Sequence, residues 1–383
     1  MDVAFYRDTW AEINLDHIYD NVTAMIKHVP KGIQVCAVVK ANAYGHGDVE
    51  VAQVALKAGV DSLAVATLDE AIVLRQKGIQ APVLILGAIR PSYAVIAAEQ
   101  NFSVTVFNNE WLKEAVTYLS GDLKLHVHLK CDTGMARLGY RKKEHLQEAE
   151  RIVREHESLN LQGVYSHFAT ADELDLTHYK KQLRRFKELV ESLSEKPDFT
   201  HFCNSAGALV HQDAWFNGVR MGISMYGLSP SQEIQDILPF SLKPAFSLRT
   251  KIVNVKKIEA GETVSYGATY VADEEQWVAT LPIGYADGWI RKLGGQSVLI
   301  DGRRMPIIGR ICMDQCMVKL PAYYPIGTDV TLIGVDGADA ISVDEIADKL
   351  ETINYEVVCN IGRRVPRVYI EQGKIVSVRN ELL

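Results

Sequence analysis

The stretch VCAVVKANAYGHGDVEVAQVALKA, residues 35–58, joins a short β-branched run to an amphipathic one. The run Val35–Val39 has the length and composition of a buried strand, and Val49–Ala58 has the apolar spacing of a helix packed on one face. A strand that continues through a helix into a parallel neighbour makes a right-handed crossover. The same alternation recurs along the first part of the chain. The further strands that it predicts are Leu63–Thr67, Val83–Leu86, Val104–Phe107, Leu125–Lys130, Gly163–Phe168, Thr200–Cys203 and Val219–Ile223.

Eight strand–helix units within about 225 residues predict a closed (β/α)8 barrel, a fold that usually takes roughly 250 residues. An open doubly wound sheet is the alternative, which is disfavoured because no GxGxxG motif follows the first strand. Near Leu228–Pro244 the pattern changes to a linker, and beyond it short strands and turns predict a mostly β domain with one helix at Val343–Leu350. We therefore expect an α/β fold with a barrel domain over residues 1–240 and a β domain over 241–383. The first few residues could pack with the β domain.

The composition is that of an ordinary globular protein, with 48% apolar and 23% charged residues. The net charge is −7 and the basic residues are scattered, which argues against a nucleic-acid partner. No apolar run reaches the roughly 20 residues that cross a bilayer, and the first residues lack the pattern of a signal peptide. The six cysteines are widely spaced without a CxxC pair, which favours free thiols in a cytoplasmic protein over a metal site.

Two lysines occupy places that favour chemistry, since catalytic groups of such barrels follow the carboxyl ends of the strands. Lys40 comes directly after the first strand, where partial desolvation lowers a lysine pKa as Schiff-base chemistry requires. The alternative is a lysine that pairs with a carboxylate at the rim. In the fifth strand, LHVHLKCD from residue 125, polar and apolar residues alternate, so Lys130 shares a face with His126, His128 and Asp132. A lysine that points into the barrel must be paired, neutral or modified.

Other candidates follow the later strands. Arg137 could hold a carboxylate with two parallel hydrogen bonds, or form a surface ion pair. His167 ends the sixth strand. Ser205, after the seventh, would cap the next helix and offer a phosphate seat together with the region of Arg220 after the eighth.

At this point the chain resembles the alanine racemases. The segments that carry the resemblance are AVVKANAYGHG (37–47), KCDTGMARLG (130–139), SHFA (166–169), NSA (204–206), RMGISMYG (220–227), VSYG (264–267), GYADG (284–288), GRICMDQ (309–315), NYE (354–356) and RVPR (364–367). They span nearly the whole chain in family order. The stretch Asn360–Arg363 has no counterpart among them and receives no role.

The resemblance implies a pyridoxal 5′-phosphate enzyme that works as a head-to-tail homodimer. Lys40 would hold the cofactor covalently and Arg220 would face its pyridine nitrogen. Arg137 would contact the phenolic oxygen and, with the backbone of Met313, the substrate carboxylate. The remaining expected cofactor ligands are Tyr44, His167, Asn204, Ser205, Gly222, Ile223 and Tyr355. In relatives Lys130 can be carbamylated. Tyr285 and Arg310 would line the approach to the site, and Asp314 would orient a neighbour or pair with an arginine.

The activity that the resemblance implies is interconversion of L- and D-alanine, which would supply D-alanine for peptidoglycan. Two bases on opposite faces of Cα would move the proton: Lys40 for the D-isomer and Tyr266 of the partner subunit for the L-isomer. A tyrosine pKa starts near ~10, so we expect His167, with Arg220 behind it, to lower it.

Three rival functions are weighed against this one. A decarboxylase of the same fold would be expected to place an acidic residue where Arg220 stands. A racemase of broader range, acting on serine for example, is a second rival. Pocket size would decide the substrate range, and a difference of one methylene is worth only about 1–3 kcal/mol. A non-catalytic pyridoxal phosphate carrier would resemble the barrel alone, without the β domain that carries Tyr266.

Overall fold

The computed structural model describes residues 5–383 in two compact units. Residues 1–4, which the predicted barrel domain included, lie outside the described residues. The barrel unit comprises His17–Ala43 and Asp48–Lys243. The β unit comprises the chain up to Asp16, Tyr44–Gly47 and Pro244–Leu383.

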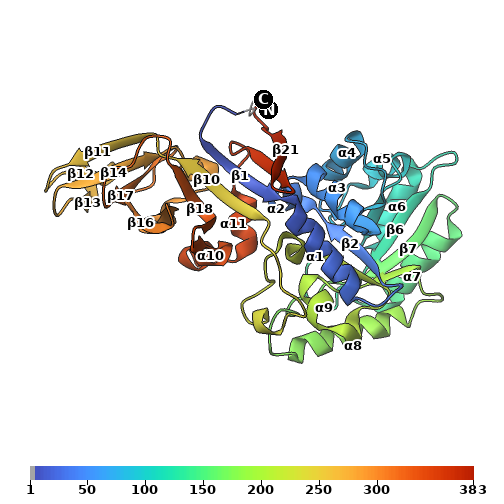
Figure 1. The fold of residues 1–383 in the computed structure, drawn as a ribbon. Helices are drawn as coiled ribbons and strands as arrows, with labels where there is room; N and C mark the ends of the chain where they lie inside the picture. The colour runs from blue at the N-terminus through green and yellow to red at the C-terminus, as the bar shows by residue number, and fades with distance from the viewer. Residues whose placement is uncertain (1–4) are drawn as a thin grey trace. The chain divides into compact units, whose positions relative to one another are not determined.

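The barrel unit is a closed ring of eight parallel strands with helices outside it (Figure 1). The strands are β2 (Gln34–Val38), β3 (Ser62–Val65), β4 (Val83–Ile85), β5 (Ser103–Val106), β6 (Leu125–Lys130), β7 (Leu159–Tyr165), β8 (Phe199–His201) and β9 (Gly218–Met221). They pair in chain order, and β9 closes on β2 with Ala37 opposite Met221. The helices are α1 (Leu15–His28), α2 (Lys40–Tyr44), α3 (Asp48–Ala58), α4 (Leu68–Gln76), α5 (Ala94–Glu99), α6 (Asn109–Ala115), α7 (Lys143–Glu155), α8 (Thr177–Val190) and α9 (Ser205–Val210). The predicted barrel is confirmed.

Local sequence explains these elements. Strands β2 and β4 are buried along nearly their whole length, which is why they read as apolar runs rather than as polar–apolar alternation. Helices α7 and α8 are strongly amphipathic, and α4 and α6 begin at polar caps: Thr67 and Glu70 form a capping box at α4, and Asn108 accepts from the Trp111 amide at α6.

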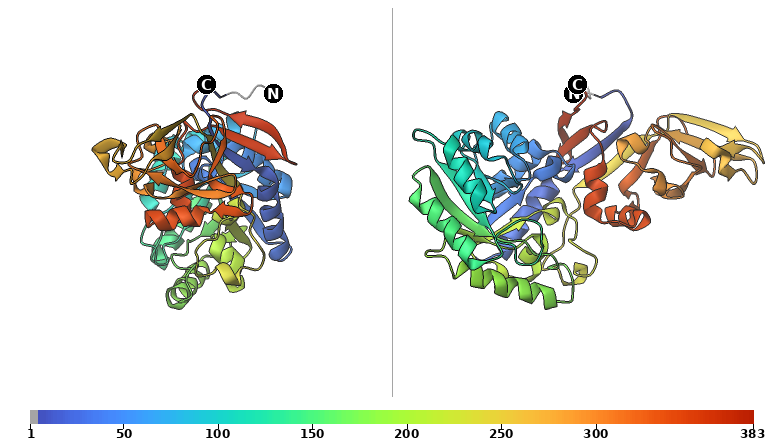
Figure 2. Two further views of the ribbon diagram at one scale, coloured as in Figure 1. Left: turned by 60° about the vertical axis from the view of Figure 1, so that its left-hand side comes forward. Right: turned by 180° about the vertical axis from the view of Figure 1, so that it is seen from behind.

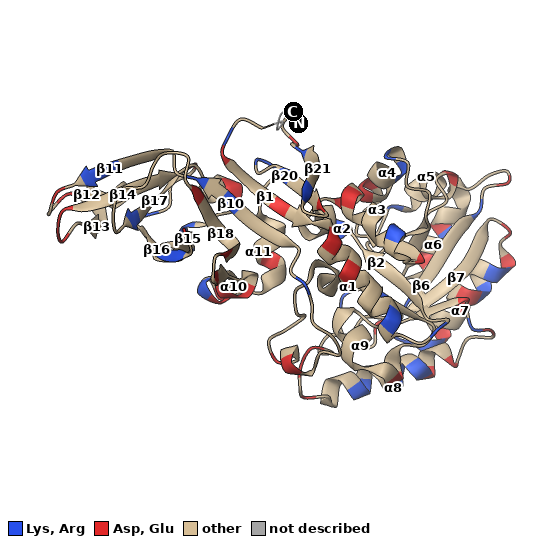
Figure 3. Cartoon of the chain, viewed as in Figure 1, with Lys and Arg blue, Asp and Glu red and all other residues tan. Residues whose placement is uncertain are grey.

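Charged residues of both signs are interleaved along α7 and α8, which Figure 3 shows in red and blue. Three ion pairs at i,i+4 spacing link them, Arg151–Glu155 and Arg154–Glu150 on α7 and Arg184–Glu188 on α8. Among residues 5–383, no helix has the length and apolarity that crossing a bilayer would take.

The β unit is built on one long sheet (Figure 2). Its strand order is β11-β14-β17-β16-β15-β18-β10-β1-β20-β21, with β19 paired to β18 and a separate β12–β13 ribbon. The strands are β1 (Thr9–Asn14), β10 (Phe246–Lys251), β11 (Asn254–Ile258), β12 (Thr263–Val264), β13 (Tyr270–Val271), β14 (Gln276–Leu281), β15 (Ser297–Ile300), β16 (Arg303–Ile308), β17 (Cys316–Leu320), β18 (Asp329–Asp336), β19 (Asp339–Ile341), β20 (Arg367–Glu371) and β21 (Lys374–Arg379). Its helices are α10 (Val343–Leu350), at the predicted bounds, and α11 (Asn354–Asn360). The predicted mostly β second domain is confirmed.

The first strand of the chain belongs to this sheet. β1 pairs antiparallel with β10 and parallel with β20, so it joins two strands that lie far away in sequence. Its burial alternates strictly, as expected for a strand with one face on a core.

Candidate active site

Parallel strands in a closed barrel bring the segments that follow them to one rim. Lys40 follows β2, Arg137 follows β6 and His167 follows β7. Ser205 follows β8, and Gly222 follows β9, the neighbour of β2. The barrel unit therefore collects these predicted site residues at the carboxyl end of its strands.

The backbone turns left-handed immediately after Lys40. Ala41, Asn42, Ala43 and Tyr44 all have φ between 50° and 54°, although none of them is glycine. The left-handed region costs an L-residue roughly 1–2 kcal/mol, and such conformations cluster at functional sites. The Ala41 amide donates to Glu70 Oε1 at 2.7 Å and the Asp48 amide to Asn42 Oδ1 at 3.1 Å, which helps to hold the turn. The turn begins with Lys40 partly buried at the end of its strand.

Lys130 points into the barrel, as the alternation in β6 predicts, and is 5% exposed. Its Nζ lies 4.1 Å from the centre of the Tyr165 ring. Desolvation, followed by the charges of Arg220 and Arg137, holds the Lys130 pKa well below its usual value. No carboxylate among residues 5–383 forms an ion pair with Lys130. A neutral or modified amine is therefore the arrangement that this burial allows.

Arg220, on β9, is buried and fixed by hydrogen bonds to the strand ends around it. Its Nη2 donates to the carbonyls of Ser166 at 2.9 Å and Phe202 at 3.0 Å. Its Nη1 lies 2.5 Å from His201 Nδ1, and Nη2 lies 3.2 Å from His167 Nδ1. A guanidinium of this kind has little freedom to turn towards other partners.

These contacts assign the protons of the neighbouring histidines. Because a guanidinium only donates, Nδ1 of His167 and of His201 must accept, so each neutral ring carries its proton on Nε2. His201 Nε2 therefore donates to His128 Nδ1 at 3.1 Å. Burial and the charge of Arg220 hold the pKa of His167 and His201 well below its usual value and lower that of His128 to about 3. The network is a line of neutral rings anchored by one arginine.

The sequence motifs include neither His128 nor His201, and the network gives His201 a direct contact with Arg220, a predicted site residue. The two histidines are 73 residues apart, so no local spacing could have paired them. The available signal was the position of His128, two residues before Lys130 on the same face of β6.

The predicted phosphate seat lies between β8 and β9, with one correction. Asn204, not Ser205, caps α9, because its Oδ1 accepts from the Gly207 amide at 3.0 Å. Ser205 Oγ instead accepts from the Gly222 amide at 2.8 Å and the Ser224 amide at 3.4 Å. The Ser224 hydroxyl is fully buried and has no hydrogen-bond partner in the described chain. Hydroxyls and amides thus gather at one point, with Ile223 buried between them.

The rim is strongly positive. After desolvation, the charges of Arg220, Lys130, Arg137 and Lys40 are the causes that lower the pKa of His167. Arg137 itself is exposed, in a turn where Asp132 Oδ1 accepts from the amides of residues 134 and 136. Arg220, Arg137 and Lys40 around one histidine make a field that suits a phosphate or a carboxylate.

The other predicted site residues lie in the β unit. Tyr266, Met313 and Asp314 line one open hollow together with Ser265, Cys312 and Gln315. The Tyr266 side chain is 72% exposed and Met313 is 53% exposed. Ser265, at φ 70°, donates from Oγ to the Arg310 carbonyl at 2.5 Å, which ties the Tyr266 turn to the facing loop.

Three further contacts place the remaining predicted residues within the β unit. The Asp314 carboxylate pairs with Arg364 at 2.8 Å, which is the second of its two expected roles. The Tyr285 amide donates to the Cys312 carbonyl at 3.0 Å. The rings of Tyr44 and Tyr355, both expected cofactor ligands, lie 6.1 Å apart between centroids.

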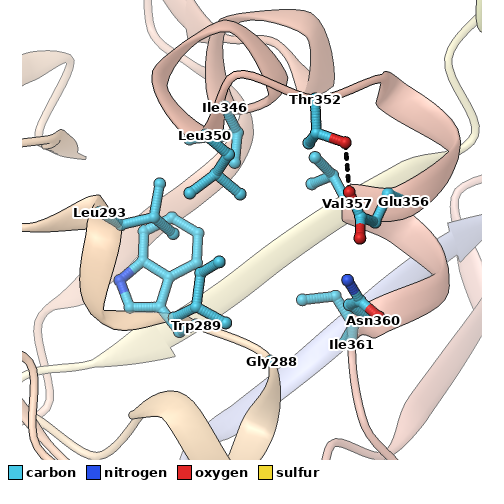
Figure 4. Close-up of a pocket in the computed structure, with 11 residues that line it drawn as sticks. Gly288, Trp289, Leu293, Ile346, Leu350, Thr352, Glu356, Val357, Asn360 and Ile361 are labelled. Atoms are coloured by element: carbon cyan, nitrogen blue, oxygen red, sulfur yellow. Dashed lines mark hydrogen bonds between the residues drawn. The ribbon is translucent and has the colours of Figure 1, made fainter.

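A cavity of about 220 Å³ in the β unit contains none of the predicted residues (Figure 4). Its wall is mainly apolar, from Trp289, Leu293 and Ile361, and Thr352 bonds to Glu356 at one side. Asn360, from the stretch without an assigned role, also lines it. Part of the stretch Asn360–Arg363 therefore lines this cavity, and the cavity is separate from the predicted site residues.

Comparisons with known proteins agree with this geometry. Residues 13–230 match the model of the alanine racemase N-terminal domain, and residues 245–369 match that of the C-terminal domain. Alanine racemase of Anoxybacillus flavithermus is 52% identical over the full length of both chains. The crystal structure of alanine racemase from Bacillus anthracis with bound L-Ala-P is similar with a TM-score of 0.96 and 48% identity over 99% of each chain. A histidine racemase of Leuconostoc mesenteroides is similar with a TM-score of 0.91 and 32% identity over 96% of this chain and all of its own.

Proposed function

The chain belongs to the alanine racemase family, and from this premise we propose that it interconverts L- and D-alanine with Lys40 and Tyr266 as the two bases. The observation that carries the proposal is Lys40 itself, at the end of β2 and directly before a left-handed turn, on a rim that also carries Arg220 and Arg137. A racemase needs a group that removes a proton from one face of Cα and another that returns it to the opposite face.

We propose pyridoxal 5′-phosphate as the cofactor. The residues present fit it, because the rim offers a lysine, an orphaned buried hydroxyl at Ser224 and the amides beside Ser205. When bound, this cofactor supplies an electron sink that acidifies the α-proton of an amino acid. Lys40 would hold it covalently and Arg220 would face its pyridine nitrogen. The phosphate would be held by Tyr44, Ser205, Gly222, Ile223 and Tyr355, and Asn204 would be a further cofactor ligand.

Arg220 would influence which reactions occur. It presents only N–H donors and its anchors hold it in place, so it would donate to the pyridine nitrogen without protonating it. This limits the electron sink and disfavours side reactions such as transamination. It is also the feature that disfavours a decarboxylase, for which an acidic residue is expected in this place.

His167 would prepare the tyrosine base. Its Nδ1 accepts from Arg220, so its Nε2 carries a proton that can be donated to a phenolate oxygen. A hydrogen bond to the charged form lowers the pKa of a tyrosine. Tyr266 would come from the partner subunit of a homodimer, which agrees with its exposure on the single chain.

Arg137 and the backbone of Met313 would bind the substrate carboxylate, with Tyr285 and Arg310 lining the approach. Arg137 is exposed beside the buried Lys130. A carbamate on Lys130 would convert a desolvated amine into an anion that can pair with Arg137. None of the six cysteines forms a disulfide among the described residues, which supports a cytoplasmic location, where D-alanine would serve peptidoglycan synthesis.

Alanine is the proposed substrate, ahead of serine or other amino acids. A protein named as a histidine racemase is 32% identical to this chain, whereas the alanine racemase of Anoxybacillus flavithermus is 52% identical to it. The higher identity supports alanine as the substrate.

The test is incubation of the purified protein with L- or D-alanine in heavy water. Each enantiomer should yield the other, with deuterium at Cα of the product. Serine at the same concentration measures the substrate range. Loss of the carboxylate as CO2 would support the decarboxylase instead, and unchanged alanine would contradict the proposal.

A further inference from the structure

Helix α8 carries one polar residue on a face that is otherwise buried and apolar. Gln182 is fully buried, next to Tyr179, Leu183 and Phe186. A buried amide without partners costs about 1–3 kcal/mol, so a glutamine here must be bonded. None of the sequence motifs includes it.

Gln182 bonds to both of the loops that follow β6 and β7. Its Nε2 donates to Thr133 Oγ1 at 3.2 Å and to the His167 carbonyl at 3.1 Å. Its Oε1 accepts from the Ala169 amide at 2.9 Å. One side chain therefore satisfies both backbone groups on either side of Phe168 and reaches across to the next loop.

The loop on the β6 side is the turn that presents Arg137. Thr133 lies within this turn, which Asp132 closes through its bonds to the amides of residues 134 and 136. Thr133 Oγ1 also lies 2.9 Å from Ser166 Oγ, which donates to the Cys131 carbonyl at 2.7 Å. These bonds connect the Arg137 turn to the β7 strand end at several points.

Space is restricted where α8 meets this turn. A Cβ on Gly134, at φ 152°, would lie 3.2 Å from Gln182 Cγ and 3.1 Å from His178. The glycine permits a close approach that brings the Gln182 amide within reach of the turn.

We propose that Gln182 is a positioning residue of the racemase, fixing the His167 loop and the Arg137 turn relative to each other. The proposal rests on the proposed function, in which His167 prepares the tyrosine base and Arg137 binds the substrate carboxylate. Gln182 touches neither substrate nor cofactor. Its effect acts through the backbone of one loop and the Thr133 side chain of the other.

The test compares Gln182→Met with wild type, both as holoenzymes. Methionine has a similar volume and cannot form the three hydrogen bonds. We expect kcat/KM for alanine to fall about 10- to 100-fold, with part of the loss in KM because Arg137 is less well placed. We also expect the Ala169 amide to exchange its hydrogen at least about tenfold faster, which is independent of activity. Gln147→Met, on α7, is the matched control, since within residues 5–383 Gln147 bonds only to the Ser192 carbonyl near the surface, and it should change neither readout.

Two outcomes would overturn the proposal. Faster exchange at Ala169 with kcat and KM within twofold of wild type would make Gln182 purely structural. Unchanged exchange would mean that the hydrogen bond does not restrain the loop. If Gln182→Met does not fold, Gln182→Glu replaces it with kcat/KM as the readout, because it keeps the acceptor for Ala169 and loses the donor to Thr133 and His167. The Ala169 amide should then exchange at the wild-type rate, and a kcat/KM within twofold of wild type would overturn the proposal. A wild-type protein without racemase activity would instead contradict the proposed function. Failure of the proposed function can therefore be distinguished from failure of the role proposed for Gln182.

Discussion

The barrel rim and the open hollow of the β unit present their polar groups in opposite ways. Arg220 is 2% exposed and held by neighbouring strand ends, whereas Tyr266 is 72% exposed on a short turn. Burial fixes the first set of groups and shifts their pKa values, and exposure leaves the second accessible.

The contrast separates two tasks of a two-base racemase. The barrel unit contains a lysine, a cation-rich rim and neutral histidines whose tautomers are set by Arg220. The β unit offers a tyrosine that is directed away from its own core. We infer that the barrel supplies a preorganised half of the site and that the exposed tyrosine completes the site of a second copy.

The largest effect is expected when the base of the barrel unit, Lys40, is removed. Lys40→Ala should lower racemisation at least about a thousandfold, because it removes a base and the covalent anchor together. Alanine enantiomers measured by chiral chromatography give the rate. Lys77→Ala, at the exposed end of α4, is the control and should retain wild-type activity.

The same experiment can examine the anchor directly. Borohydride reduction followed by peptide mass analysis should find the cofactor adduct on the peptide that contains Lys40 in the wild-type protein. A reduced adduct on another lysine would contradict the assignment.

Removal of the exposed base sharpens the comparison. Tyr266→Phe should reduce racemisation about 10²- to 10⁴-fold and leave proton abstraction by Lys40 in place. Washout of α-deuterium from D-alanine, which uses Lys40, should persist, while washout from L-alanine should be lost. Tyr323→Phe alters an exposed tyrosine elsewhere in the β unit and should affect neither. Equal residual washout from both enantiomers would count against the two-base assignment.

The smallest expected effect concerns stability rather than activity. His128 has a pKa of about 3 in the folded protein, below its ordinary ~6.5, because it is buried beside Arg220. Between about pH 3 and 6.5, His128 is therefore protonated in the unfolded chain and neutral in the folded protein. Its contribution to the free energy of unfolding is complete above about pH 6.5 and is lost as the pH falls. Each such histidine contributes a slope of about 1.4 kcal/mol per pH unit.

His128→Gln should remove one of these slopes. Urea unfolding between pH 4 and 6 should then show a free energy of unfolding that falls less steeply with decreasing pH than in wild type, by about 1.4 kcal/mol per unit. Identical slopes in the two proteins would mean that His128 is already protonated in the folded state.

The sequence predicts most of the fold because its signals are local. The buried parallel strands read as short β-branched runs, and β6 and α10 have the predicted bounds. The interpretation of β1 is harder, since its partners β10 and β20 lie more than 200 residues away. The left-handed turn after Lys40 also has no signal, because Ala41 and Ala43 ordinarily favour right-handed backbone.

The site residues also divide into those that local sequence signals predict and those that depend on contacts between distant segments. Lys40, Arg137 and Arg220 follow from their places at strand ends and from a family resemblance, and the closed barrel brings their segments to one rim. His201 and Gln182 act through side-chain hydrogen bonds across 13 to 73 residues, which no periodicity encodes.

The central claim is that Lys40 of one copy works with Tyr266 of another, and co-expression of two inactive variants tests it most directly. Chains carrying Lys40→Ala and Tyr266→Phe, with different affinity tags, would pair at random. Half of the dimers would then be mixed, each with one intact site, so the mixture should recover about one quarter of wild-type activity. Activity no higher than that of either variant alone, in dimers shown by their tags to be mixed, would contradict the account.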